Sequence, residues 1–169
     1  MQNIQNRILN KEETLRKIKR IAFEIYEHNF EEKEIIIAGI YDTGYIFADI
    51  LKQEVERISP IKVLLVKVQL NKGLPQQSNV ELDCDPAKLK GKTVIVADDV
   101  LNTGRTLAYS LNPFLHTELK KLQVAVIIDR AFRLFPISAD FVGYSLSTTV
   151  NEHVTVELEN NERYGVYLN

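Results

Sequence analysis

Two adjacent carboxylates, Asp98 and Asp99, follow a short apolar run and stand just before a turn rich in hydroxyl groups. The turn reads Asn102-Thr103-Gly104-Arg105-Thr106, and a helical pattern begins within it. Backbone N–H groups at a helix start attract phosphate, hydroxyl and guanidinium groups add donors, and glycine lets the backbone approach closely. Paired carboxylates accept from both hydroxyls of a ribose or hold water around Mg²⁺. The segment predicts a site for a phosphorylated, polyhydroxylated ligand, the alternative being a helix cap and a common turn.

A second turn of interest, Tyr41-Asp42-Thr43-Gly44, follows another apolar run. Ligands of open parallel sheets bind beyond the carboxyl ends of the strands, where both turns would lie. Gly39 and Gly44 have the glycine spacing of a P-loop, but Tyr45-Ile46 stands where that motif needs Lys and Ser or Thr. No G-x-G-x-x-G occurs. Both of these nucleotide motifs are therefore excluded.

The pattern of apolar residues predicts strands and helices that would position these turns. Four short, continuously apolar, β-branched runs are typical of strands buried on both faces of a sheet, and amphipathic stretches between them indicate helices. This alternation predicts an α/β fold with a mostly parallel sheet flanked by helices. The expected strands are residues 34–40, 61–70, 93–97 and 122–128, and the expected helices are residues 11–28, residues 45–57 and a third from the 102–106 turn to about 117.

The C-terminal part has a different pattern, because short β-like pieces follow one another without helices between them. Residues 140–145, 153–158 and 164–168 are expected to form a small cap or an antiparallel addition. Between the second and third strands, residues 71–79 have no apolar period and contain Gly73 and Pro75. They indicate an exposed loop.

Composition narrows the class of protein. The 169 residues, 45% of them hydrophobic, suit a single domain over residues 1–169. A formal net charge of -2 gives no global attraction to nucleic acid or to an anionic membrane. No apolar run could span a bilayer and the N-terminus lacks the apolar region of a signal peptide, so a cytoplasmic protein is expected. One cysteine and three scattered histidines leave oxygen ligands for any metal.

The segment from Val94 to Leu107 resembles the phosphoribosyl diphosphate (PRPP) signature of type I phosphoribosyltransferases: an apolar strand, two acids, then Thr-Gly-Arg-Thr. The resemblance continues through Asp129-Arg130, Phe135-Pro136-Ile137 and Asp140-Phe141-Val142-Gly143, as in pyrimidine operon attenuators that are also uracil phosphoribosyltransferases, the PyrR-like branch. It implies a Rossmann-like sheet with a small β hood over the base. It also implies PRPP and Mg²⁺ binding, displacement of diphosphate by a nucleobase nitrogen, and a homodimer or larger assembly.

The resemblance assigns roles residue by residue. Asp98 and Asp99 would hold the ribose hydroxyls and Mg²⁺, and the 102–106 turn would wrap the 5′-phosphate. The 41–44 turn would be the diphosphate loop. Residues 71–79 would be a flexible lid whose closure excludes water from the reaction.

The resemblance also implies a base pocket. Phe141 would stack on the base, and the main chain of Val142 would hydrogen-bond its edge. Arg130 and Arg133 would contact the base or the diphosphate, with surface salt bridges as the alternative.

Departures from the family pattern bear on substrate and activity. Asn102 and Asp129 stand where 6-oxopurine enzymes usually have Asp and Lys, which favours a pyrimidine, with uracil first. The diphosphate loop has Asp42-Thr43 in place of a basic residue, and Lys72 is the one cation of the lid. Charge that develops in the transition state would therefore have fewer partners.

Three functions remain as alternatives. The first is a PRPP-dependent enzyme that converts uracil to UMP. The second is a nucleotide-sensing, RNA-binding regulator of pyrimidine genes with weak or no catalysis. The third is a nucleotide-binding relative that acts through a dimer interface. RNA could contact the basic residues of the first helix, although interleaved glutamates favour a solvated face; these basic residues are Lys11, Arg16, Lys17, Lys19 and Arg20.

Overall fold

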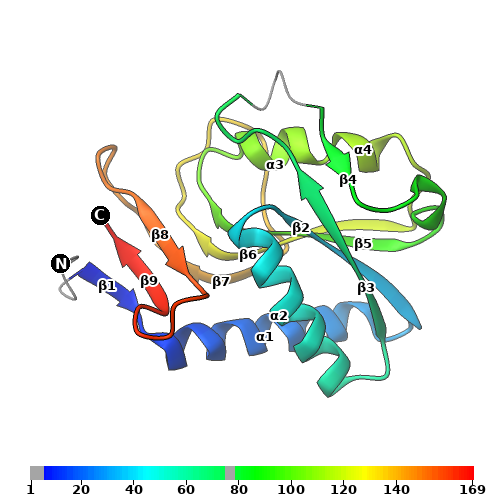
Figure 1. Ribbon diagram of the computed structural model, residues 1–169, viewed down its shortest axis with the longest axis horizontal. Coiled ribbons are helices and arrows are strands. Elements are labelled where there is room, and N and C mark those ends of the chain that lie inside the picture. Colours follow the sequence, from blue (N-terminus) through cyan, green and yellow to red (C-terminus); the bar gives the residue numbers. More distant parts are fainter. Residues whose placement is uncertain (1–5, 75–78) are drawn as a thin grey trace.

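The computed structural model describes residues 6–74 and 79–169, so residues 75–78 of the expected lid lie outside the described residues. At its centre is a six-stranded sheet with the strand order β4-β3-β2-β5-β6-β7 (Figure 1). Neighbouring strands run parallel except for β3 with β4. The strands are β2 (Glu34–Ile40), β3 (Lys62–Gln69), β4 (Glu81–Leu82), β5 (Thr93–Leu101), β6 (Lys121–Asp129) and β7 (Phe141–Ser145).

Helices cover both faces of this sheet (Figure 1). On one face, α1 (Lys11–Asn29) and α2 (Thr43–Ile58) share a core with Ile35 and Ile37 of β2. On the other, α3 (Arg105–Ser110) and α4 (Asn112–Leu115) share a core with Ile36 and Ala38. Because side chains alternate along a strand, β2 has to be apolar at every one of these positions.

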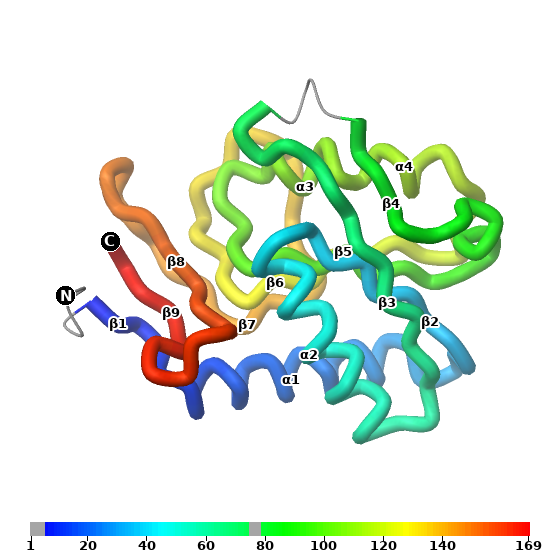
Figure 2. The backbone as a smooth tube through the Cα atoms, in the orientation of Figure 1, coloured from blue at the N-terminus to red at the C-terminus, as the bar shows by residue number. Residues whose placement is uncertain are grey.

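A smaller antiparallel sheet lies beside the first, with the strand order β1-β9-β8. Its strands are β1 (Arg7–Leu9), β8 (Val154–Glu157) and β9 (Gly165–Leu168). Figure 2 shows the first and last strands of the chain side by side in it. Val156 and Val166 are buried in the core on the α1 face, so this sheet is packed onto the main body.

The α/β class and the mostly parallel sheet are confirmed, but three details of the prediction are wrong. Residues 141–145 do not join the C-terminal addition, because β7 pairs in parallel with β6. The helix after the 102–106 turn ends at Ser110 and α4 begins anew, since Pro113 lacks an N–H group and its ring would clash inside a continuous helix. Strand β5 extends to Leu101, so the two acids lie within the strand.

Residues 86–88 form a short 3-10 turn between β4 and β5. Within the described ranges, no helix has the length and apolar character needed to cross a membrane.

Candidate active site

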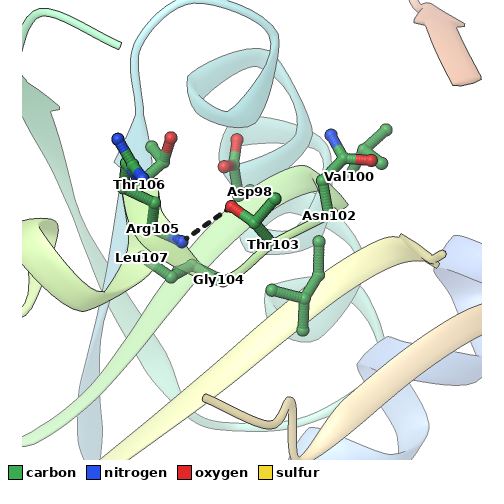
Figure 3. A pocket seen from close by; sticks show the side chains of 9 residues that line it. Asp98, Val100, Asn102, Thr103, Gly104, Arg105, Thr106 and Leu107 are labelled. Atoms are coloured by element: carbon green, nitrogen blue, oxygen red, sulfur yellow. Dashed lines mark hydrogen bonds between the residues drawn. The ribbon is translucent and has the colours of Figure 1, made fainter. Parts of the chain in front are cut away.

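A pocket opens at the carboxyl end of β5, between the buried acid and the turn that follows the strand (Figure 3). Its volume of about 40 Å³ is room for roughly three water molecules, which is the scale of a phosphate group. The side chains around it come from the end of β5, the turn and the start of α3. They are Asp98, Val100, Leu101, Asn102, Thr103, Gly104, Arg105, Thr106 and Leu107.

The 102–106 turn owes its shape to Gly104, whose φ of 86° is in the left-handed region that favours glycine. The hydroxyl of Thr103 accepts a hydrogen bond from the N–H of Arg105 at 3.3 Å, as drawn in Figure 3. The carbonyl of Thr103 accepts from the N–H groups of Leu134 and Phe135, each at 2.9 Å. The turn is thus held from behind by the segment that follows β6, which leaves its open side to the pocket.

Arg133 fastens this same segment to the turn. Its guanidinium donates to the carbonyls of Ile137 at 2.9 Å and Asn102 at 2.5 Å, and it pairs with the carboxylate of Asp129. These contacts use the side chain internally. The structure thus gives Arg133 a positioning role for the 102–106 turn, and its ion pair with Asp129 is the salt-bridge alternative that the sequence left open.

The acidic pair is divided between two environments. Asp98 is 3% exposed, whereas Asp99 is half-buried and is not among the residues that line the pocket. One oxygen of Asp98, Oδ1, accepts from the N–H of Asp99 at 3.0 Å and from Nζ of Lys72 at 3.3 Å. Burial raises the pKa of Asp98 well above its ordinary value, the charge of Asp99 adds to this, and Lys72 opposes it.

Lys72 brings a positive charge into the site from the segment after β3. Burial works against its charge, but the carboxylates of Asp98, Asp99 and Asp42 outweigh this and raise the pKa of Lys72. The ammonium group therefore stays protonated beside the acids. Lys72 belongs to the expected lid, and its contact with Asp98, 26 residues away, has no signal in the local sequence.

Replacing Asp98 by Asn is expected to stabilise the fold, by on the order of 1 kcal/mol at neutral pH. Since the folded-state pKa of Asp98 is raised above the ordinary 3.8, its carboxylate is less favourable in the folded chain than in the unfolded chain. Wild-type stability should fall as pH rises from 3.8 through the folded-state pKa, and the variant should lack this loss. Thermal unfolding of both proteins between about pH 4 and pH 8 measures it. If the stability of the two proteins changed with pH in the same way, burial would not disfavour the carboxylate of Asp98.

The 41–44 loop meets the acidic pair directly. Strand β2 ends before it, α2 begins at Thr43, and the Tyr41–Asp42 peptide bond is cis. Gly44 is packed so closely on β5 that a Cβ atom there would lie 2.7 Å from Oδ1 of Asp98. The structure therefore brings together the two turns that the sequence singled out, as the carboxyl ends of neighbouring parallel strands require.

The expected base pocket is not formed by the residues assigned to it. Phe141 is 1% exposed and its ring packs edge-on against His28 at 5.4 Å, so it is a core residue on the α1 face. The carbonyl of Val142 accepts from Arg20 at 2.9 Å. Arg130 is buried and donates to Thr148 and to the carbonyl of Thr149. The local pattern gave no sign of the face of β7 on which each side chain falls.

Replacing Phe141 by Leu should therefore act on stability and not on ligand binding. We expect the free energy of unfolding to fall by about 1 kcal/mol, because a buried ring is exchanged for a smaller apolar side chain. The affinity for UMP should stay unchanged. Denaturant unfolding and calorimetric titration measure the two quantities. Reduced UMP affinity with unaltered stability would restore the stacking role.

The model of the phosphoribosyl transferase domain family matches residues 5–161 of the chain. The chain belongs to this family. Two curated relatives, each named "Bifunctional protein PyrR", support the PyrR-like branch. The one from Fusobacterium nucleatum is 34% identical over 159 residues, which is 90% of each chain. The one from Bacillus pumilus is 33% identical over 172 residues, or 95% of this chain and 96% of the relative.

Solved structures of the family share the fold. The hypoxanthine phosphoribosyltransferase of Trypanosoma cruzi aligns with a TM-score of 0.78 at 16% identity, over 96% of this chain and 95% of the other. A hypoxanthine-guanine phosphoribosyltransferase of Bacillus anthracis aligns with a TM-score of 0.75 at 20% identity, over 96% and 93%. The type I phosphoribosyltransferase fold expected from the 94–107 signature is confirmed.

One further residue near the pocket was missed by the sequence analysis as a functional candidate. The ring of Phe135 lies 5.4 Å from the guanidinium of Arg105 and 6.2 Å from the ring of Tyr109. Arg105 is exposed, and the stacking holds its charge beside the turn. Phe135 follows Arg133 by two positions in a segment that also contains Phe132 and Leu134, so no local signal distinguished it.

Proposed function

We propose that the protein is a PRPP-dependent phosphoribosyltransferase, a single domain over residues 1–169, that converts uracil to UMP with release of diphosphate. The observation that carries the proposal is the continuity of the site. Asp98 borders the pocket of the 102–106 turn on one side and touches Gly44 of the 41–44 loop on the other. Ribose, 5′-phosphate and diphosphate would each meet a separate element, as PRPP requires.

In the proposed reaction, N1 of uracil forms a bond to C1′ of the ribose while the bond from C1′ to the diphosphate oxygen breaks. The electron pair of that bond leaves with the diphosphate, and the proton of N1 is released. The acids would hold the ribose hydroxyls, and the N–H and hydroxyl groups of Thr103 and Thr106 would hold the 5′-phosphate. The N–H groups of Thr43 and Gly44, at the start of α2, would face the diphosphate.

The acidic pair also fits Mg²⁺. Asp98 is a buried carboxylate that already attracts a cation, the ammonium of Lys72. The described residues contain no group of three or more His, Cys, Asp or Glu side chains suited to a metal. Mg²⁺ does not require one, because it keeps several waters and binds through one or two carboxylates together with substrate phosphates. When bound, it would neutralise charge that develops on the leaving diphosphate.

Uracil is favoured as the base by two residues. Asn102 and Asp129 stand where 6-oxopurine enzymes usually have Asp and Lys, and Asp129 is occupied by its ion pair with Arg133. The similarity to proteins named PyrR supports a pyrimidine as well. We also propose a cytoplasmic location and a homodimer or larger assembly, as the resemblance implies.

The second candidate is an RNA-binding regulator that senses a nucleotide in the same pocket. Asp42 in the diphosphate loop favours it, because an anion there opposes binding of diphosphate but not of UMP. The basic face of α1 gives it less support. Arg16 pairs with Glu12 and Arg20 with Glu24, so part of the charge is neutralised on the helix itself.

A comparison of bases tests the two candidates. The protein is incubated with PRPP, Mg²⁺ and one of uracil, orotate, hypoxanthine, guanine, xanthine or adenine, and the nucleotide formed is identified by chromatography. The enzyme should form UMP and little of any other nucleotide. If no nucleotide forms, a gel shift of a pyrimidine-operon leader RNA with and without UMP decides whether the protein is the regulator.

A further inference from the structure

Strand β3 presents a positive charge next to the 41–44 loop, which contains no basic residue. The family usually has a basic residue in the diphosphate loop, whereas the 41–44 loop contains Asp42 and Thr43. Strand β3 runs parallel to β2, and its Lys67 is level with Gly39, two residues before the loop begins. The N–H of Tyr41 also donates to the carbonyl of Val68 at 2.8 Å, which ties the start of the loop to β3.

The side chain of Lys67 is directed to this loop. Its Nζ lies 5.6 Å from the ring centre of Tyr41, at the start of the loop, and 4.8 Å from that of Tyr45, just after its end. Both distances are in the range of cation–π attraction, which holds an ammonium group in place without neutralising its charge. The two tyrosines therefore fix a full positive charge at the flank of the loop.

The charge of Lys67 has no ion-pair partner in the part of the chain that the structure describes, whereas that of Lys72 is taken by Asp98. Glu81 and Asp83 border a cavity of about 90 Å³ together with Lys67, but neither forms an ion pair with it. Asp83 accepts instead from the main-chain N–H of Lys67 at 2.6 Å. The carboxylate of Asp83 thus holds the main chain of β3 and leaves the ammonium group of Lys67 available to a ligand.

We propose that Lys67 supplies the missing cation of the diphosphate loop and binds the diphosphate group of PRPP. The inference rests on the proposed function, because it takes PRPP as the substrate. It assigns Lys67 a ligand role that UMP, which has no diphosphate, cannot use. The role is therefore separable from a general effect on the fold or on the 102–106 turn.

Calorimetric titrations of PRPP, Mg²⁺-diphosphate and UMP test the proposal on Lys67→Gln and Lys67→Arg variants. Loss of a charged hydrogen bond should weaken PRPP and diphosphate binding to Lys67→Gln by about 10-fold or more. UMP affinity should be unchanged, and Lys67→Arg should recover most of the PRPP affinity. Lys62→Gln is the matched control, since Lys62 is exposed at the opposite end of the same strand and its loss removes the same charge.

Two results would overturn the proposal while leaving the proposed function intact. If Lys67→Gln binds PRPP as the wild type does, the diphosphate does not use this cation. If UMP and PRPP affinities fall together, Lys67 acts on the structure of the site and not on the diphosphate. A wild type that binds neither PRPP nor UMP would overturn the proposed function, and this inference with it.

Discussion

Replacing Asp98 and Asp99 together by asparagine is expected to reduce uracil-dependent UMP formation by about 10³-fold or more. The pair would orient the ribose hydroxyls and hold Mg²⁺, so both ground-state positioning and stabilisation of the leaving diphosphate are lost. The variant should remain folded, because Asn at position 98 still accepts the hydrogen bond from the N–H at position 99. Steady-state rates with saturating uracil and varied PRPP measure the effect.

The matched control for this variant is the Glu159→Gln, Glu162→Gln pair, which changes the net charge equally. Both glutamates are exposed in the connection between β8 and β9. The control should keep wild-type rates, and circular dichroism should show all three proteins folded. If the Asp98, Asp99 double variant retained wild-type turnover and PRPP affinity, the acidic pair would not be part of the active site.

Replacing Gly104 by Ala is expected to weaken binding of both PRPP and UMP by about 10-fold or more. A φ of 86° costs a residue with a Cβ about 1 kcal/mol, and the added atom would lie 3.2 Å from Cβ of Ile137. The segment behind the turn is fixed by Arg133 and by the hydrogen bonds to Thr103, so the turn itself has to move. Displaced N–H and hydroxyl donors then lose the 5′-phosphate, at about 1.5–3 kcal/mol for each bond to a charged group.

Gly91→Ala separates the backbone effect from the effect on the site. Gly91 has a similar φ of 70°, but a Cβ atom there would have no neighbour within 4 Å. Both variants should lose about 1 kcal/mol of stability, whereas only Gly104→Ala should lose ligand affinity. Calorimetry with UMP and thermal unfolding measure the two effects. Equal UMP affinity in the two variants would contradict phosphate binding by the 102–106 turn.

The residues around the acidic pair were predictable because their signals are local. A continuous apolar run, two acids and a turn containing glycine lie within residues 93–106, and neighbouring parallel strands present their carboxyl ends at one edge. The 41–44 loop follows from the same rule applied to β2. Only the end of the strand was misplaced, because the pairing of β5 with β6 continues past Ala97 through Asp98, Val100 and Leu101.

The contacts that complete the site were not predictable from spacing. Arg133 reaches the carbonyl of Asn102 across 31 residues, and Lys72 reaches Asp98 across 26. The role of Phe141 depended on β7 joining the main sheet without a crossover helix, which places its side chain against α1. Lys67 is an ordinary polar residue in a strand until register places it beside the 41–44 loop.

Uracil-dependent release of diphosphate from PRPP and Mg²⁺ by the wild-type protein tests the central claim most directly. We predict steady release that requires uracil, with UMP formed in equal amount. If PRPP and UMP bind at this site but no base causes diphosphate to be released from PRPP, an enzymatic function is contradicted. In that case the protein would be a nucleotide sensor built on the phosphoribosyltransferase fold.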